Sequence, residues 1–125
     1  MADNYCVIDI YDCTKPGDIY LVWSKEQAEE LQELLNYDHQ DDPIYFSVYG
    51  PVTGPEDLHG MLRSEFATDL RIGVFRSLWE SLERCGEDAY IKWDAKLEGI
   101  SPLHKEKMRR DIKPLRKEKR RRYNL

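Results

Sequence analysis

The fold is decided by residues 5–35, which read YCVIDIYDCTKPGDIYLVWSKEQAEELQELL. Residues 5–11 alternate between two faces as in a strand, and residues 19–23 form a second apolar run of strand length. Between them, Pro16-Gly17 favours a turn, because proline presets φ and glycine accepts a positive φ. These patterns predict an antiparallel hairpin.

A helix is predicted directly after this hairpin. Ser24 is a suitable N-cap, and Gln27 stands three residues later, as in a capping box. The apolar positions that follow have helical spacing and predict one buried stripe, made of Ala28, Leu31, Leu34 and Leu35. Residues 44–49 alternate again and predict a third strand, which completes a ββαβ unit.

The second half of the chain predicts two further helices. Gly54-Pro55 suits a helix start, and a stripe of apolar residues follows, made of Leu58, Met61, Leu62, Phe66 and Leu70. A second stripe, rotated relative to the first, is made of Ile72, Phe75, Leu78, Trp79 and Leu82. The rotation predicts a break within residues 68–73, and Cys85-Gly86 predicts the end of the second helix.

The remaining residues are less regular. Residues 88–97 fit either a helix or a short strand, and both interpretations stay open. A last basic helix is predicted from Pro102 to a kink at Pro114, with residues 115–125 frayed. Together these elements predict an α+β fold: a small antiparallel sheet from the ββαβ unit, covered by C-terminal helices and followed by a basic C-terminal tail.

Charge divides the chain into two parts. Residues 103–125 hold eleven lysines and arginines against three acids, a net charge of +8. Residues 1–102 hold eight against 21, a net charge of −13. We therefore predict an acidic α+β domain over residues 1–102 and a basic helical or frayed tail over residues 103–125. Clustering of like charge costs stability, and it favours contact with charged macromolecules.

The hairpin and the stretch Ser24-Lys25-Glu26-Gln27-Ala28-Glu29-Glu30-Leu31 carry a resemblance. Over residues 5–35 the chain resembles a strand–strand–acidic-helix arrangement found in small accessory proteins of phages and mobile elements. Members of that group with known roles often inhibit or redirect host machinery, including restriction and CRISPR complexes. The resemblance therefore implies a protein-binding inhibitor of the anti-defence type, and it assigns no functional residue.

The basic tail is the first candidate binding site. Lysine and arginine side chains beside phosphates release condensed counterions, and an aromatic ring can stack on a base. The alternatives are that the tail binds a protein partner, folds back on the acidic body, or only aids solubility. The candidate residues are Arg109, Arg110, Lys113, Arg116, Lys117, Lys119, Arg120, Arg121, Arg122 and Tyr123.

An acidic ridge is the second candidate. It can imitate the phosphates of a nucleic acid and occupy the basic channel of a partner protein, although such a ridge is also typical of a solvated helix face. Like charges one helical turn apart are mildly destabilising, which favours the functional interpretation slightly. The ridge consists of Glu26, Glu29, Glu30, Glu33, Asp38, Asp41 and Asp42.

The tyrosines of the predicted sheet are the third candidate. One face carries Cys6, Ile8, Ile10, Ile19, Leu21, Trp23, Ile44, Phe46 and Val48. If this face packs against the helix that begins at Ser24, the opposite face carries Tyr5, Tyr11, Tyr20, Tyr45 and Tyr49. An open aromatic face can stack single-stranded bases. We expect the second-half helices to cover it instead, because a sheet with apolar residues on both faces buries both.

The sequence contains no catalytic or metal-binding motif. His39, His59 and His104 are far apart, and there is no HExxH, CxxC, GxSxG or phosphate-binding glycine loop. We therefore expect no enzymatic activity, no catalytic residue, no cofactor and no metal. Three cysteines without metal-type spacing, no membrane-spanning apolar run and no signal sequence predict a cytoplasmic protein with reduced thiols and no membrane contact.

These observations predict a small non-enzymatic regulatory or inhibitory protein. Its acidic body and basic tail would bind a protein partner, most simply a complex that itself binds nucleic acid. The alternative is an accessory protein that binds RNA or DNA directly through the basic tail and the sheet tyrosines. A third class is a structural component that docks its basic helix onto an acidic subunit.

Overall fold

The computed structural model describes residues 4–10, 17–38, 45–66, 70–87 and 89–110. The elements within them are β1 (Asn4–Ile10), β2 (Ile19–Val22), α1 (Lys25–Asp38), β3 (Tyr45–Val52), α2 (Pro55–Glu65), α3 (Ile72–Cys85), β4 (Ala89–Asp94) and β5 (Gly99–His104). The strands form one sheet in the order β3-β1-β2-β4-β5, and all neighbours are antiparallel. The predicted α+β class with an antiparallel sheet is confirmed.

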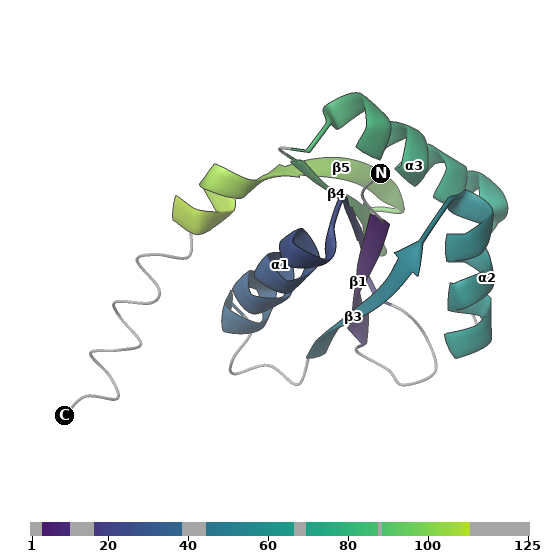
Figure 1. The fold of residues 1–125 in the computed structure, drawn as a ribbon, viewed down its shortest axis with the longest axis horizontal. Coiled ribbons are helices and arrows are strands. Elements are labelled where there is room, and N and C mark those ends of the chain that lie inside the picture. Colours follow the sequence, from purple (N-terminus) through teal and green to yellow (C-terminus); the bar gives the residue numbers. More distant parts are fainter. Residues whose placement is uncertain (1–3, 11–16, 39–44, 67–69, 88, 111–125) are drawn as a thin grey trace.

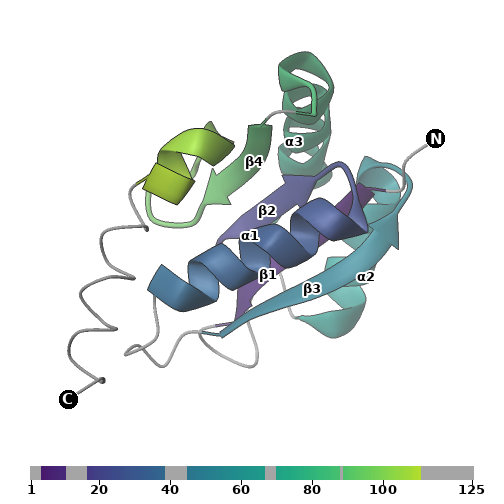
Figure 2. The same ribbon diagram turned by 60° about the vertical axis from the view of Figure 1, so that its left-hand side comes forward.

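Helix α1 covers one face of the sheet. It connects β2 to β3, and Figure 2 shows it in front of β1, running nearly along the strands. The predicted buried stripe of α1 is confirmed, since Ala28, Leu31, Leu34 and Leu35 are all buried. The cluster under α1 also includes Val7, Tyr20, Val22, Phe46 and Tyr90.

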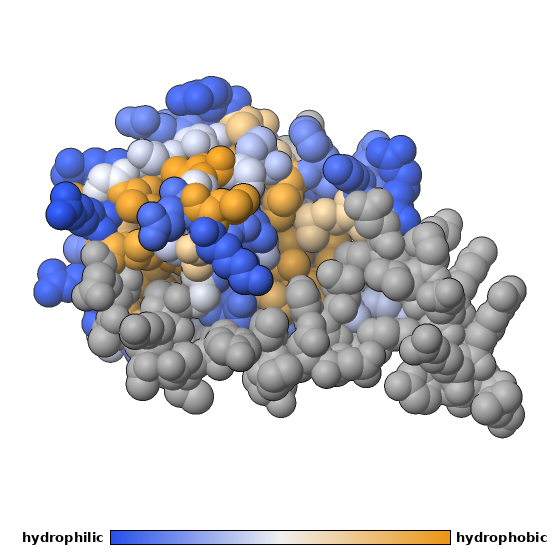
Figure 3. All heavy atoms as spheres, turned by 180° about the vertical axis from the view of Figure 1, so that it is seen from behind, coloured by the Kyte–Doolittle hydropathy of each residue, from blue (hydrophilic) through white to orange (hydrophobic). Residues whose placement is uncertain are grey.

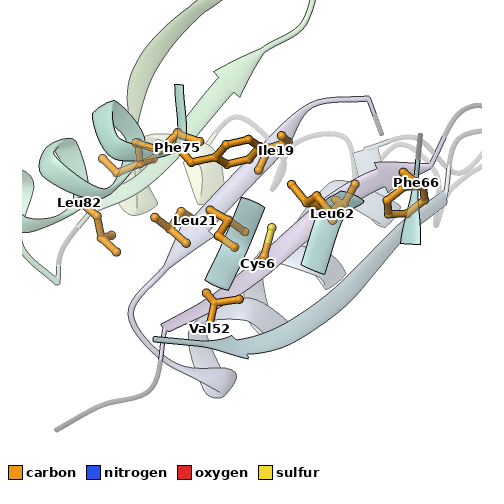
Figure 4. Packing of buried hydrophobic residues seen from close by; sticks show 12 residues of the cluster. Cys6, Ile19, Leu21, Val52, Leu62, Phe66, Phe75 and Leu82 are labelled. Atoms are coloured by element: carbon orange, nitrogen blue, oxygen red, sulfur yellow. The ribbon is translucent and has the colours of Figure 1, made fainter. Parts of the chain in front are cut away.

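Helices α2 and α3 cover the opposite face (Figure 1). Their buried side chains pack on those residues of β1 and β2 that alternate with the α1-facing ones (Figure 4). This cluster contains Cys6, Ile8, Ile19, Leu21, Val52, Leu58, Leu62, Phe66, Phe75, Leu78, Leu82 and Ile91. Every residue of β2 is therefore buried, two on each face.

The predicted assignment of the two faces is wrong. Helix α1 packs on the face of Val7 and Tyr20, whereas the face of Cys6 and Ile8 receives α2 and α3. For the third strand, Phe46 and Val48 do face α1 as predicted. They share that face with Val7 rather than with Cys6 and Ile8, because Val7 pairs with Val48. Alternation fixes which residues share a face within one strand. It does not fix how one strand is aligned with the next.

In the C-terminal part, the structure settles one open alternative and moves the start of the basic helix. Residues 89–94 form a strand rather than a helix, which settles the alternative left open. The basic helix does not begin at Pro102, because Pro102 lies in β5 opposite Ile91, and the helical residues are 105–110. The domain boundary predicted after Pro102 falls inside β5, so the sheet continues through His104. The break between the two second-half helices is confirmed by the ends of α2 and α3.

A β-bulge shifts the faces of β3 near its end. Tyr49 pairs with Cys6 and Val52 pairs with Asn4, so two residues of β3 lie opposite Tyr5 alone. As a result, both Tyr49 and Val52 contact the cluster under α2 and α3. Gly50 sits in the bulge with φ +141°, and a Cβ there would lie 2.9 Å from Cδ1 of Tyr5. The bulge therefore requires glycine for backbone conformation and for space.

We predict that Gly50→Ala lowers the free energy of unfolding by about 2 kcal/mol, because it adds both backbone strain and a clash with Tyr5. The matched control is Gly60→Ala in α2, where a Cβ meets nothing within 4 Å. That change raises stability by about 0.5–1 kcal/mol, since alanine is the better helix former. Urea unfolding of both variants checks this. Equal midpoints for the two would contradict it.

Candidate interaction surfaces

The start of α1 is fixed by side-chain hydrogen bonds. Oγ of Ser24 accepts from the N–H of Gln27 at 3.2 Å, as the predicted cap requires, and Oε1 of Gln27 accepts from the N–H of Trp23 at 3.0 Å. Nε1 of Trp23 and Nε2 of Gln27 donate to the carbonyls of Gly86 and Glu87, at 2.7 and 2.8 Å. These bonds tie α1 to the turn after α3 and so hold its outer face in place.

The outer face of α1 carries the predicted acidic ridge. Glu26, Glu29 and Glu33 are exposed, whereas Glu30 is partly buried. Asp38 is the last residue of α1, and Asp41 and Asp42 lie outside the described residues. Helix α1 holds one lysine against four glutamates and one aspartate, so its surface is strongly negative.

The helical residues 105–110 dock beside α1 rather than projecting away from it. The guanidinium of Arg109 forms an ion pair with Glu30. Nζ of Lys105 lies 5.4 Å from the ring centroid of Tyr90, and Leu103 and Met108 pack against the cluster under α1. One cation of the predicted basic site is therefore neutralised by a carboxylate of the acidic ridge.

Of the other predicted tail residues, only Arg110 lies within the described part of the chain. Arg110 is exposed, and its Nε donates to the carbonyl of Glu106 at 3.4 Å. The rest of the predicted site lies outside the described residues: Lys113, Arg116, Lys117, Lys119, Arg120, Arg121, Arg122 and Tyr123.

The described tyrosines do not form one open aromatic face. Tyr20 is only 3% exposed, because α1 covers it, and Tyr5 is partly buried against the same cluster. Tyr49 lies on the other face, where its ring contacts Phe66 edge-on at 5.8 Å between centroids. Tyr11 lies outside the described residues, as does the side chain of Tyr45. A helix covers the face of Tyr5 and Tyr20, but it is α1. The expectation that the second-half helices cover this face is wrong, because α2 and α3 pack on the opposite one.

Both edge strands have features that oppose the addition of another strand. On β3, the carbonyl of Phe46 accepts from Nε2 of Gln32 at 2.8 Å, and the N–H of Phe46 donates to Oδ1 of Asn36 at 3.2 Å. Pro51 follows in β3, and Pro102 lies in the middle of β5. Proline and bonded backbone groups make an edge a poor template. Partners are therefore expected to bind through side chains.

A groove runs along the β3 side of α1. It has a volume of about 430 Å³ and opens to solvent next to the acidic ridge. One wall comes from α1 and the other from β1 and β3; the residues are Lys25, Glu29, Gln32, Tyr5, Val48, Gly50 and Pro51. Sequence patterns could not identify this site, because its residues come together only when β1 pairs with β3 and α1 packs on the sheet.

A second hollow lies where α3 meets the β4–β5 hairpin. It has a volume of about 320 Å³, and its apolar walls come from Val74, Trp93 and Ile100. Leu97, at the tip of the hairpin, is 79% exposed. Figure 3 shows apolar side chains at the surface among charged ones on the face behind Figure 1.

Charged groups gather at the end of the sheet near the β4–β5 turn. Nζ of Lys92 lies 3.5 Å from Asp18 and 3.3 Å from Asp94. The N–H of Leu97 donates to Asp94, and this bond, with that of Lys96 and the charge of Lys92, lowers the pKa of the Asp94 carboxyl. These contacts brace the turn. Within the described residues, no group of three or more His, Cys, Asp or Glu is arranged to hold a metal.

The described histidines and cysteines have ordinary surroundings. Nε2 of His59 lies 3.1 Å from the carbonyl of Leu70, and His104 is exposed in β5. Cys6 is in the core, where burial raises the pKa of its thiol, whereas Cys85 is exposed. Among the helices of the described segments, none is long and apolar enough to cross a membrane.

Comparison with known proteins finds no match. No family model, no curated protein and no solved structure is similar to this chain. The chemistry of the surfaces described above is therefore the basis for a functional proposal.

We predict that Tyr90→Phe raises the free energy of unfolding by about 1 kcal/mol. The hydroxyl of Tyr90 is buried and has no hydrogen-bond partner among the described residues, and such a group costs about 1–3 kcal/mol. Phenylalanine keeps the ring that contacts Lys105 and removes the unpaired group. Thermal and urea unfolding at neutral pH measure the difference. A variant less stable than the wild type would contradict this explanation.

The same substitution has a pH signature. Burial raises the pKa of the Tyr90 hydroxyl from 10.0 to about 12. The unfolded chain therefore releases this proton first, so wild-type stability falls as the pH rises from about 10 to about 12. The stability difference between Tyr90→Phe and the wild type should widen over that interval. A constant difference would contradict the raised pKa.

We predict that Arg109→Glu frees residues 105–110 from α1, because it places two like charges together. Amide hydrogen exchange in that segment should speed up, and adding Glu30→Arg should restore protection. The overall free energy should change by less than about 1 kcal/mol, since both side chains are partly exposed. The control is Arg76→Glu, at the exposed pair with Glu56 between α3 and α2. Unchanged exchange in Arg109→Glu would show that the ion pair does not hold the segment.

Proposed function

We propose that this chain is a small non-enzymatic regulatory or inhibitory protein, of the anti-defence type that phages use. It binds a cytoplasmic protein complex that itself handles nucleic acid. The acidic face of α1 contacts the basic surface of that complex, and the basic residues after 110 add contacts of the opposite sign.

The observation that carries the proposal is the close juxtaposition of the two charge types. The ion pair between Arg109 and Glu30 starts the basic segment at the same helix that carries exposed Glu26 and Glu29. A surface of both signs suits a protein partner, because complementary charge steers encounter and fixes orientation. Bare nucleic acid carries phosphates only, and α1 repels them.

Direct binding of RNA or DNA is the alternative. Stacking of bases on the sheet tyrosines loses support, because Tyr20 is buried and Tyr49 lies on the other face from Tyr20. Contact of basic residues with phosphates depends on residues after 110 and is decided by the experiment below. Docking of the basic helix onto an acidic subunit is a further outcome that the same experiment separates.

Two sets of substitutions in the full-length chain test the proposal. The first is Glu26→Gln with Glu29→Gln on α1, and the second is Arg120→Gln with Arg121→Gln and Arg122→Gln. The proteins retained from the source cell by the wild type are compared with those retained by each variant, with quantitative mass spectrometry. We expect nucleic-acid-binding proteins to be lost or strongly reduced with the α1 variant. Glu80→Gln with Glu83→Gln, at exposed positions of α3, is the control.

Fluorescence anisotropy with bare RNA and DNA across a salt series completes the test. We expect weak binding to both. Tight, salt-steep binding that the arginine variant abolishes and the α1 variant leaves intact would reject the proposal in favour of direct nucleic-acid binding. Retention of an acidic protein that only the arginine variant loses would favour the subunit-docking class instead.

A further inference from the structure

The groove between α1 and β3 combines apolar surface with one carboxylate, on Glu29, and one ammonium group, on Lys25. It lies against a helix that holds five acids and this one lysine. Tyr5, Val48 and Pro51 supply ring and aliphatic surface, and Gln32 and Glu29 line the groove from α1. Glu29 is exposed, so its carboxylate is accessible at the mouth of the groove. Lys25 stands at the same mouth as the only cation of α1.

This combination matches the chemistry of an arginine side chain. Its methylene groups can lie on Val48 and Pro51, while its planar guanidinium stacks on the ring of Tyr5 and hydrogen-bonds a carboxylate. A neutral ligand would make no use of the carboxylate of Glu29. An anion would meet Glu29 in the groove and the strongly negative surface of α1 around it, where Lys25 is the one cation of the helix.

The chain itself shows that α1 accepts a guanidinium. On the other flank of the helix, Arg109 pairs with Glu30, and the apolar side chains of Leu103 and Met108 pack beside it. The β3 flank has the same ingredients, with Glu29 in place of Glu30 and the apolar surface supplied by Val48 and Pro51. Strand addition does not compete there, because Gln32 and Asn36 already bond the backbone of Phe46.

We propose that the groove between α1 and β3 receives an arginine side chain from a basic segment of a partner protein, with Glu29 as its ion-pair partner and Tyr5 as its stacking surface. This inference rests on the proposed function, since it names the site on α1 through which the protein partner binds.

The test uses the full-length protein, labelled with ¹⁵N, and two probes: acetylated hexa-arginine amide and acetylated hexa-lysine amide. Amide shifts are followed during titration at low and moderate salt. We expect the arginine peptide to move the signals of Tyr5, Gln32 and Val48 and to bind more tightly than the lysine peptide, because only a guanidinium stacks and pairs at once. Glu29→Gln should weaken the arginine peptide roughly fivefold.

Glu83→Gln is the matched control, because Glu83 is equally exposed but lies on α3. It should leave both the affinity and the groove signals unchanged. Unfolding midpoints of the two variants, compared with the wild type, show that the fold is intact in each.

Three results would overturn the inference. The first is equal affinity of the two peptides with no effect of Glu29→Gln, which would mean diffuse attraction to an acidic surface. The second is peptide-induced shifts that avoid the groove. The third is a change of the groove signals on Arg120→Gln, Arg121→Gln and Arg122→Gln without peptide, which would mean that the chain's own C-terminal segment is the occupant. The proposed function is judged separately, by which cellular proteins are retained.

Discussion

The structure depends on the burial of β1 and β2 on both faces. These strands are central in the sheet, and their side chains alternate between α1 on one side and α2 with α3 on the other. A sheet of this kind cannot leave either face open, because the apolar surface of both must be removed from water. The need to cover two faces explains why α1, α2 and α3 all pack on the sheet, and why the tyrosines whose side chains are described do not form one open face.

The surfaces left for binding a partner are therefore the outer faces of the helices and the grooves between a helix and the neighbouring strands. The edges of the sheet oppose pairing with another chain, through Pro51, Pro102 and the side chains that bond Phe46. Helix α1 is held at its start by bonds from Trp23 and Gln27 to the turn after α3. Its acidic face is therefore displayed in a fixed orientation, with a groove on one flank and residues 105–110 on the other.

Much of the local structure could be predicted from particular residues. Ser24 and Gln27 cap α1, Gly54-Pro55 begins α2, and the rotated apolar stripe separates α2 from α3. Each signal acts within one element, where spacing and capping chemistry suffice. The strands β4 and β5 were harder to predict from the sequence, because a short apolar run fits a buried strand and a helix equally well. The ridge on α1 followed from helical spacing, whereas the groove beside it joins residues from β1, α1 and β3.

The elements of the first half, the two-helix break and the division of charge between body and C-terminus could all be predicted from the order of the amino acids. These depend on neighbours three or four residues apart and on composition. Long-range packing, in contrast, sets which helix covers which face, how β3 is aligned with β1, and where Arg109 finds a carboxylate. Strand alignment is fixed by packing across strands and by the bulge at Gly50, and an ion pair between residues 30 and 109 exists only once both elements are docked.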